Sequence, residues 1–451
     1  MQIVHYYRVA CAKGFRQLVV TARNTNPLVR TMASSSISEK FAPAARLEGI
    51  DKNVWVEFVS LVSKYQPVNL GQGFPDFAPP DYIVEALKEA SGKPLIHQYT
   101  RSQGHPRLVK ALANMFSKVY NRDIDGMSEI ITTIGSYNAL FYSFQSFVHP
   151  GDEVVVIEPF FDCYSPMTKM AGGVLKPVPL RPKNGATSSA DWVLDPAELE
   201  AAFSPKTKLF IINTPNNPLG KIFTRSELEM MAEMCHKYNV LCISDEVYEW
   251  LIYDDNVFTK IATLPGMWDR TITIGSAGKT FSMTGWKTGW AVGPAGLIKH
   301  MQTVNANSCF TAPTILQEAI AVGIEHETAV LGQDGSYFKE LPRMLQVKRD
   351  EVYKALKEVG MNPIIPQGGY FMLANTSNLG LTFDNNDEAY DFQVCKWMIA
   401  NKGLGAIPPS AFYSSKNAHL ITNYIRFNFA KSDETVKAAL QILQDWAKEI
   451  H

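Results

Sequence analysis

The feature that most constrains the fold is a series of short apolar runs that alternate with helix-like segments between about residues 80 and 335. Each run is nearly continuous in Val, Ile, Leu and similar residues, as are strands buried on both faces of a parallel sheet. The runs are Ile130–Ile134, Glu153–Ile157, Lys208–Asn213, Val240–Ser244, Thr271–Gly275 and Trp290–Gly293, and helical patterns such as Asn138–Val148 and Arg225–Tyr238 lie between them. The alternation predicts an α/β fold with a large, doubly wound and mostly parallel sheet.

The length of the chain implies more than one packed unit, because single cores stop growing at about 250–300 residues and this chain has 451. Beyond Leu341 the short apolar runs give way to longer helices. The pattern predicts a long helix through Leu356, a strand at Gly369–Ala374, a helix at Asp387–Asn401 and a closing helix after Asp433. We therefore expect a large domain over residues 80–335 and a smaller α+β domain built from residues 38–79 and 336–451.

The amino-terminal segment differs from the rest of the chain. No acidic residue precedes Glu39, whereas basic residues recur among apolar ones at Arg8, Lys13, Arg16, Arg23 and Arg30. This pattern is typical of a mitochondrial targeting leader, which we expect over residues 1–37. The alternative is a disordered extension, because the Met-Ala-Ser-Ser-Ser stretch at Met32 resembles a second start for a cytosolic form.

Composition narrows the class of function. The formal net charge of −1 at pH 7 provides no bulk attraction to nucleic acid. With 46% hydrophobic residues but no apolar stretch of about 18 residues, the chain is expected to be globular and without a membrane span. Its six cysteines form no CxxC pair and no metal-ligand spacing, so we expect reduced, mostly buried thiols and no metal site. A small-molecule ligand is the favoured partner.

The strongest candidate for chemistry is Lys279, in a glycine-rich segment that directly follows the run Thr271–Gly275. A lysine just beyond the carboxyl end of a buried strand can reach a ligand in the crevice at that edge of the sheet. Its amine can form a Schiff base with a carbonyl compound. The alternative is a surface lysine in a glycine-rich turn.

Two further motifs end strands of the same predicted sheet. The run Val240–Ser244 is followed by Asp245 and Tyr248, and the run Lys208–Asn213 is followed by an Asn- and Pro-rich turn that contains Asn217. Taken singly, Asp245 could cap a helix, Tyr248 could fill the core, and the turn could be an ordinary β-turn. Because the carboxyl ends of parallel strands lie at one edge, their shared position favours a common site with Lys279.

An anion site is predicted where the run Ile130–Ile134 passes into a helix through Gly135, Ser136 and Tyr137. Backbone amides at a helix N-terminus bind phosphate and other anions. Ser276 and Lys287 would complete this site, with the lysine contributing a point charge.

A planar ligand and a carboxylate would find partners elsewhere in the chain. Phe160 and Phe161 follow a strand end, and we expect Phe161 to stack on a ring, although both could simply fill the core. Arg426 stands among apolar neighbours, where a charge is costly unless paired. It is suited to hold a carboxylate through two parallel hydrogen bonds, the alternative being a structural salt bridge.

Together these motifs resemble those of class I aminotransferases, in family order over roughly residues 40–450. Within that class the chain is similar to the kynurenine aminotransferase or cysteine-S-conjugate β-lyase group, also called glutamine transaminases. The segments that carry this similarity are Gly49–Phe58, Asn69–Phe77, Gln98–Thr100 and Glu158–Tyr164. The chain departs from part of the group at Thr311, where some members have histidine, and this departure concerns the side-chain preference.

The resemblance implies a fold type I enzyme that uses pyridoxal 5'-phosphate (PLP). Lys279 would carry PLP as a Schiff base and act as general base and acid. Asp245 would keep the pyridine nitrogen protonated, and Tyr248 and Asn217 would contact the phenolic oxygen. The residues that would hold the phosphate and the ring are Gly135, Ser136, Tyr137, Ser276, Lys287 and Phe161.

On the substrate side, the resemblance implies that Arg426 binds the α-carboxylate near Gly71 and Asn217. Trp55 and Tyr99 would shape the side-chain pocket, with Tyr99 reaching in from the partner subunit of a homodimer. The expected reaction moves the amino group of kynurenine, glutamine or another amino acid to a 2-oxo acid, converting kynurenine to kynurenic acid. Elimination from cysteine S-conjugates is the expected second activity. The family's chain path also predicts a cis peptide at Asn217–Pro218.

Two other functions compete with this one. A dedicated PLP-dependent C–S lyase or synthase on the same fold would keep Lys279 and Asp245 but would not turn over 2-oxo acids. A non-enzymatic regulator would need a DNA-binding module, for which the first 38 residues are too short and the net charge offers no support.

Overall fold

The structure is a computed structural model that describes residues 41–50, 54–384 and 387–450. The described residues 41–48 belong to one unit and those from Gly49 onward to another. The described part of the first unit contains one short 3₁₀ helix, η3 (Ala45–Leu47). The leader predicted over residues 1–37 lies outside the described residues, and all remaining elements belong to the second unit.

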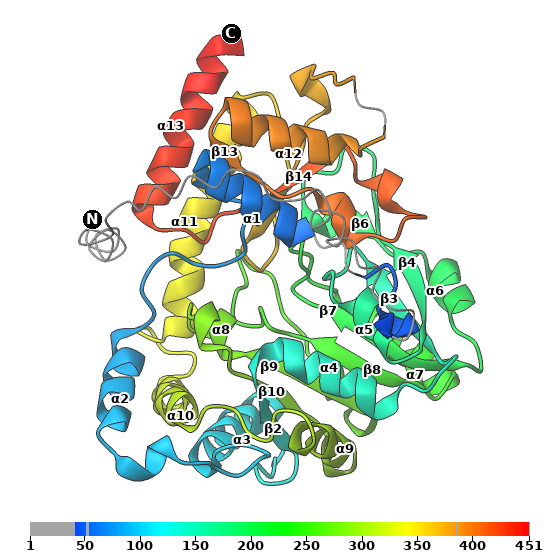
Figure 1. The fold of residues 1–451 in the computed structure, drawn as a ribbon, viewed down its shortest axis with the longest axis vertical. Helices are drawn as coiled ribbons and strands as arrows, with labels where there is room; N and C mark the ends of the chain where they lie inside the picture. Colours follow the sequence, from blue (N-terminus) through cyan, green and yellow to red (C-terminus); the bar gives the residue numbers. More distant parts are fainter. Residues whose placement is uncertain (1–40, 51–53, 385–386, 451) are drawn as a thin grey trace, which may run out of the picture. The chain divides into compact units, whose positions relative to one another are not determined.

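A seven-stranded sheet forms the centre of the second unit (Figure 1). Its strand order is β2 (Ile130–Thr133), β10 (Gly289–Val292), β9 (Thr271–Ser276), β8 (Leu241–Asp245), β7 (Thr207–Asn213), β3 (Glu153–Glu158) and β4 (Val174–Pro179). The pairs from β9 through β8, β7 and β3 to β4 are parallel. The predicted α/β fold with a mostly parallel sheet is confirmed, and all six apolar runs are strands. Strand β4 was not predicted. It is an edge strand, a position at which its prolines are tolerated.

The prediction that the run Trp290–Gly293 is parallel to its neighbours is wrong. This strand, β10, is antiparallel to both β2 and β9, and Gly289 pairs with Ser276. For β10 to run parallel to β9, the chain would need a long crossover connection between the two strands. The segment between β9 and β10 instead contains only the short helices α8 (Ala277–Thr280) and η8 (Thr284–Trp286).

Helices cover both faces of the sheet, as a doubly wound fold requires. Along β3, Val154 and Val156 lie in a core with α4 (Gly135–Phe147), α5 (Tyr164–Met170) and α9 (Ala295–Ala306). The alternate residues Val155 and Ile157 lie in a second core with α6 (Pro196–Ala202) and α7 (Arg225–Lys237). A third core joins Ile130 and Trp290 to α2 (Asp81–Ser91), α3 (Pro106–Tyr120) and α10 (Thr314–Ala329).

The carboxy-terminal part forms a second group of elements, drawn in the upper part of Figure 1. A three-stranded antiparallel sheet of β11 (Asn362–Pro363), β12 (Phe371–Asn375) and β14 (Tyr424–Asn428) lies with α11 (Tyr337–Glu358), α12 (Tyr390–Asn401) and α13 (Asp433–Ile450). Two amino-terminal elements join it: α1 (Val54–Tyr65) and β1 (Val68–Asn69), which pairs in parallel with β13 (Leu404–Gly405). Phe58 of α1 packs on Phe392 of α12 with ring centroids 5.9 Å apart. The division into domains at residues 80 and 335 stays a prediction.

Short elements complete the described residues. A two-stranded ribbon pairs β5 (Arg181–Pro182) with β6 (Trp192–Val193). The 3₁₀ helices are η4 (Pro94–His97), η5 (Ser189–Asp191), η6 (Ile261–Thr263), η7 (Trp268–Arg270), η9 (Ser377–Leu379), η10 (Pro409–Phe412) and η11 (Ala418–Leu420). Among the helices of the described residues, none has the length and apolar character needed to cross a membrane. The described cysteines are free thiols, and only Cys309 is exposed.

Candidate active site

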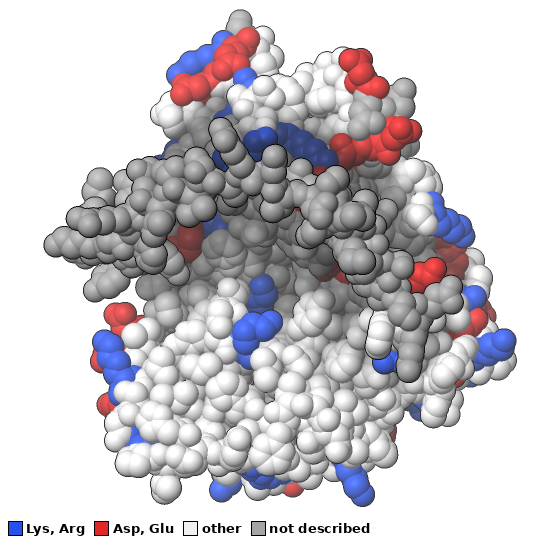
Figure 2. Space-filling view, in the orientation of Figure 1, with Lys and Arg blue, Asp and Glu red and all other residues white. Residues whose placement is uncertain are grey.

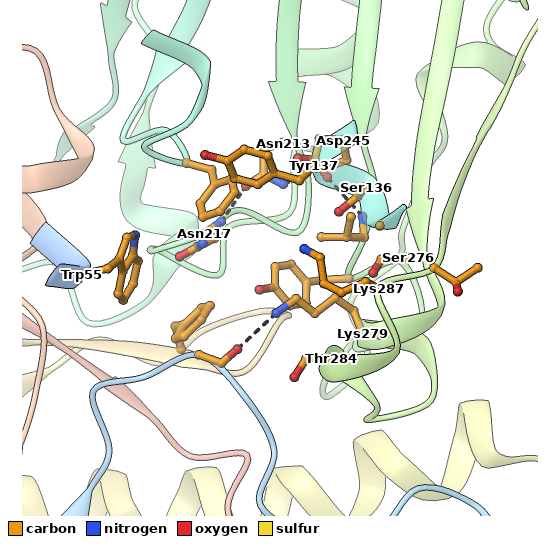
Figure 3. Close-up of a pocket in the computed structure, with 18 of the residues that line it drawn as sticks. Trp55, Ser136, Tyr137, Asn213, Asn217, Asp245, Ser276, Lys279, Thr284 and Lys287 are labelled. Atoms are coloured by element: carbon orange, nitrogen blue, oxygen red, sulfur yellow. Dashed lines mark hydrogen bonds between the residues drawn. The ribbon is translucent and has the colours of Figure 1, made fainter. Parts of the chain in front are cut away.

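The strand ends that carried the motifs meet at one cavity of about 250 Å³ (Figure 3). Asn213 at the end of β7 pairs directly with Asp245 at the end of β8, and β9 continues into the segment that holds Lys279. All the residues expected to contact the cofactor line this cavity, as do Trp55 and Arg426. The cavity walls also include Gly73, Asn213, Val247, Gly278, Thr284, Thr288 and Phe371.

Lys279 points into this cavity from α8. Its Nζ atom donates a hydrogen bond to the hydroxyl of Tyr370 at 2.6 Å and another to the carbonyl oxygen of Gly73 at 3.1 Å. The Tyr370 hydroxyl in turn donates to the same carbonyl at 2.9 Å. The lysine is therefore a positioned amine and not a surface residue of a loose turn.

Asp245 is the buried acid of the cavity, with 3% of its surface exposed. The hydroxyl of Tyr164 donates to its Oδ2 atom at 2.6 Å. Burial raises the pKa of Asp245 to about 6, while the hydrogen bond from Tyr164 and the charge of Lys279 act in the opposite direction. No helix follows Asp245, so the alternative role as a helix cap does not apply.

Tyr248 comes from the same segment and packs edge-on against Tyr370, with ring centroids 5.0 Å apart. Burial raises the pKa of Tyr248 well above its usual value, because the interior disfavours a phenolate. The hydroxyl therefore stays a neutral donor at the wall of the cavity.

The turn after β7 places Asn217 between two other side chains. Its backbone amide donates to Asn213 Oδ1 at 2.7 Å, and its own Oδ1 accepts from Arg426 Nη1 at 2.9 Å. The predicted cis peptide at Asn217–Pro218 is confirmed. Two further cis peptides, at Thr214–Pro215 and Glu158–Pro159, were not predicted.

The N-terminus of α4 forms one end of the cavity, where Figure 3 shows Ser136, Ser276 and Lys287 grouped together. Gly135 opens the helix at φ 71°, a conformation that favours glycine. Gly289 lets β10 approach closely, because a Cβ atom on it would lie 2.5 Å from the Ser136 amide nitrogen. Backbone amides, a hydroxyl and an ammonium group thus converge on a site suited to a phosphate.

Aromatic rings form a further part of the cavity wall. Phe161 lines the cavity and lies edge-on to Tyr137, with centroids 6.1 Å apart, whereas Phe160 is buried in the core beneath the sheet. The indole of Trp55 donates to Asp162 Oδ2 at 2.8 Å. This hydrogen bond ties α1 to the segment that follows β3.

Arg426 is fully buried on β14. Its Nη1 and Nη2 atoms donate to Asn217 Oδ1 at 2.9 Å and to the Gly71 carbonyl oxygen at 3.0 Å, while its buried Nε atom has no hydrogen-bond partner. Within the described part of the chain it forms no ion pair with a carboxylate, so the structural salt bridge considered above is absent. Burial lowers the pKa of Arg426 to about 10. A buried guanidinium without a counter-ion favours an anionic ligand at this end of the cavity.

Two predicted residues lie outside the cavity. Gly71 contributes its carbonyl oxygen to Arg426 and does not itself line the cavity. Tyr99 is 85% exposed and packs edge-on against Phe310. Its predicted place in the pocket of a partner subunit stays a prediction.

Sequence reasoning missed several residues of the site. Tyr370 accepts a hydrogen bond from Lys279. It is preceded by Gly368 and Gly369 at the start of a predicted strand, and this glycine pair was the one sequence feature that could have drawn attention to it. Tyr164 and Gly73 stood inside recognised segments but carried no signal of contact with Asp245 or Lys279. Their roles depend on packing between distant parts of the chain.

Comparison with known proteins gives evidence that is independent of the geometry of the cavity. The family model for aminotransferase class I and II matches residues 65–443. The mouse protein kynurenine–oxoglutarate transaminase 3 is 50% identical over 433 residues, which cover 95% of each chain. Human kynurenine–oxoglutarate transaminase 1 is 50% identical over 418 residues, covering 90% of this chain and 99% of the human one. The crystal structure of Bna3p from Saccharomyces cerevisiae superposes with a TM-score of 0.85 at 32% identity, covering 90% of this chain and 99% of Bna3p.

Proposed function

The chain belongs to the class I and II aminotransferases, and from its similarity to kynurenine–oxoglutarate transaminases we propose that it transfers the amino group of kynurenine, glutamine and related amino acids to a 2-oxo acid. It is an aminotransferase that depends on PLP, as members of this family do. The observation that carries the choice of substrate class is Arg426, which is buried in the same cavity as Lys279 and forms no ion pair with a carboxylate of the described residues. An amino acid presents the carboxylate that such a guanidinium binds.

The cavity fits PLP by the chemistry of its donors. The amide nitrogens at the start of α4, with Ser276 and Lys287, suit the phosphate, and the lack of a side chain at Gly289 leaves the Ser136 amide nitrogen the room that a Cβ atom would take. The buried acid Asp245 suits the ring nitrogen, Tyr248 and Asn217 suit the phenolic oxygen, and Phe161 suits the ring face. When bound, PLP supplies an electron sink for the negative charge that develops at the α-carbon of the amino acid.

Proton transfer and the orientation of the substrate are roles for this chain's own residues. We assign to Lys279 Nζ the transfer of the proton from the α-carbon, because this amine lines the same cavity as Asp245 and Arg426. The other lysine of the cavity, Lys287, lies with Ser136 and Ser276 at the end proposed for the phosphate (Figure 3). Tyr370 and the Gly73 carbonyl orient that amine. Arg426 orients the substrate through its α-carboxylate, and Asn217 holds the guanidinium in place from the side.

A second activity is proposed for substrates that carry a good leaving group on the β-carbon. After the α-proton is removed by Lys279, loss of that group competes with reprotonation, so cysteine S-conjugates would undergo β-elimination. The same groups serve both reactions, and no further residue is needed. A dedicated C–S lyase or synthase is the alternative, and it differs in failing to use 2-oxo acids.

We also propose a homodimer in which Tyr99 of one subunit borders the active site of the other. Exposed large apolar side chains near this region include Leu95 at 83%, Tyr99 at 85% and Phe310 at 49%. Figure 2 shows few Lys, Arg, Asp or Glu side chains over the lower part of this face, where Figure 1 places α3, α4 and α9. Depletion of charge is typical of the centre of a protein interface. For location, we propose import into mitochondria through the leader, with a form beginning at Met32 remaining cytosolic.

The proposed function is tested by a matrix of donors and acceptors. Kynurenine, glutamine, phenylalanine and aspartate would each be incubated with 2-oxoglutarate, phenylpyruvate and glyoxylate, and kcat/KM measured for every pair. We expect kynurenine to be converted to kynurenic acid with at least one of these acceptors. Release of pyruvate from a cysteine S-conjugate without any transamination would overturn the proposal in favour of the dedicated lyase.

A further inference from the structure

The segment that follows β8 separates two cavities. Asp245, Val247 and Tyr248 line the active-site cavity, whereas Glu249 and Trp250 line a second cavity of about 510 Å³. Between them Glu246 is completely buried. A change of charge on the side of this segment that faces the second cavity can therefore affect the ionisation of Asp245 on the other side.

A buried ion cluster lies on the side of this segment that faces the second cavity. Lys260 Nζ donates to Glu246 Oε2 at 2.5 Å and also to Glu249 Oε2. None of the three side chains is more than 6% exposed. The Ser244 hydroxyl donates to the other oxygen of Glu246, Oε1, at 2.7 Å. One ammonium group thus serves two carboxylates, and the cluster carries a formal charge of −1.

The surroundings of Lys260 are otherwise aromatic. Its ammonium lies 5.6, 5.4 and 5.3 Å from the ring centroids of Phe116, Tyr120 and Phe258. Aromatic faces stabilise the cation but contribute no formal charge. Within the part of the chain that the structure describes, Lys260 is the only cation paired with Glu246 or Glu249. Its loss would leave two buried carboxylates uncompensated.

We propose that Lys260 is a positioning residue of the active site: it neutralises Glu246, and by doing so keeps the neighbouring Asp245 ionised for the cofactor's ring nitrogen. The inference rests on the proposed function, since it takes Asp245 as the partner of that nitrogen. It goes further in assigning an electrostatic role to a residue that touches neither cofactor nor substrate.

The charges around Asp245 support this direction. Glu246 raises the pKa of Asp245 and Lys279 lowers it, while Tyr164 stabilises the carboxylate by its hydrogen bond. Among the described residues, the buried Tyr248 and Cys163 also lie close enough to interact with Asp245, and both are neutral at ordinary pH. With Lys260 removed, the full charge of Glu246 would act on Asp245, and a smaller fraction of Asp245 would be ionised at neutral pH.

The test compares apoenzyme variants by their affinity for PLP, measured through quenching of tryptophan fluorescence. Lys260→Met should weaken PLP binding at pH 7 by roughly tenfold, because a rise in the pKa of Asp245 from about 6 to about 8 leaves roughly one tenth as much of it ionised. Lys260→Arg should bind like the wild type. Raising the pH to 8.5 should bring Lys260→Met back towards the wild type, because Asp245 then ionises despite its raised pKa. A purely structural role would not produce that convergence.

Two double variants form the matched control and remain informative if the single variant does not fold. Lys260→Met/Glu246→Gln and Lys260→Met/Glu249→Gln have the same composition and leave the cluster with the same formal charge of −1. The first removes the carboxylate next to Asp245 and should restore PLP affinity to within about threefold of the wild type. The second leaves Glu246 uncompensated and should stay roughly tenfold weaker.

The possible outcomes distinguish a failure of the role proposed for Lys260 from a failure of the proposed function. Equal PLP affinity for the two double variants, or a Lys260→Met deficit that is the same at pH 7 and pH 8.5, would overturn the role of Lys260 and leave the proposed function intact. A wild-type protein that neither binds PLP nor transaminates in the donor and acceptor matrix would overturn both. Thermal unfolding of each apoenzyme identifies variants that are merely unfolded.

Discussion

The Nζ atom of Lys279 donates a hydrogen bond to the hydroxyl oxygen of Tyr370 at 2.6 Å, and both groups contact the carbonyl oxygen of Gly73. Lys279 lies in the segment after β9, Tyr370 directly precedes β12, and Gly73 lies in the loop after β1. The reactive amine is therefore positioned by parts of the chain that only the folded structure brings together. The orientation of Lys279 depends on how the seven-stranded and three-stranded sheets pack together, as well as on its place after β9.

Lys279→Ala should abolish transamination, because the group that carries the α-proton is lost. We expect kcat to fall by at least about a thousandfold, as general acid–base and nucleophilic roles disappear together. Reduction with borohydride followed by peptide mapping should yield a PLP adduct on Lys279 in the wild type and none in the variant. Lys206→Ala, at an exposed lysine, serves as the control. A variant that remained active would remove Lys279 from the mechanism.

Tyr370→Phe tests the orientation of the amine. The variant keeps the ring that packs on Tyr248 but loses the hydroxyl bonded to Lys279. For a hydrogen bond of about 1–2 kcal/mol, kcat should fall roughly five- to thirtyfold while KM changes little. The borohydride adduct on Lys279 should still form. A change confined to KM would instead place the hydroxyl in contact with the substrate.

Arg426→Lys tests the proposed carboxylate clamp. Lysine keeps the charge but loses the planar fork, so one charge-assisted hydrogen bond of about 1.5–3 kcal/mol should go. The specificity constant should fall roughly ten- to hundredfold for glutamine, kynurenine and phenylalanine alike. Visible absorbance of the bound cofactor should be retained, because Arg426 is not assigned to the phosphate or the ring. If only one donor were affected, Arg426 would read the side chain.

Gly289→Ala tests the phosphate end of the cavity. A Cβ atom here would lie 2.5 Å from the Ser136 amide nitrogen, so the N-terminus of α4 must shift. Loss of one charge-assisted hydrogen bond should weaken PLP binding by roughly tenfold or more. Gly285→Ala is the matched control in the same segment, because a Cβ atom there meets nothing within 4 Å. Equal PLP dissociation constants for the two variants would contradict the proposed phosphate site.

Asp391→Asn tests a buried acid away from the cavity. Asp391 accepts hydrogen bonds from the backbone and hydroxyl of Ser410, and burial raises its pKa to about 6. A carboxyl with a raised folded pKa stabilises the fold below its unfolded pKa, and this contribution is lost as the pH rises through about 6. The asparagine variant lacks that titration. Its free energy of unfolding relative to the wild type should improve by about 1 kcal/mol between pH 5 and pH 7. Denaturant unfolding at the two pH values would show it, and an unchanged difference would refute the raised pKa.

Much of the site followed from sequence because the motifs are local. Asp245 and Asn213 each stand at the end of an apolar run, and parallel strands bring such ends to one edge of a sheet. The choice of Phe161 over Phe160 concerned the direction of two adjacent side chains. Phe161 lines the cavity and Phe160 lies in the core, and the stacking of Phe161 on a ring stays a prediction. The direction of β10 was mistaken because an apolar run has the same composition whether its neighbours are parallel or antiparallel.

What the sequence determined by itself is six of the seven strands of the central sheet, the α/β class and the residues at the strand ends, because hydrophobic period and turn chemistry act within a few residues of one another. The tertiary structure alone decided which distant groups touch. Arg426 meets Asn217, Tyr164 meets Asp245, and Lys260 meets Glu246 across a buried segment. Such contacts depend on strand order and on how helices dock against the sheets. A buried charge is tolerated only where that docking supplies its partner, and no local pattern encodes the partner's identity.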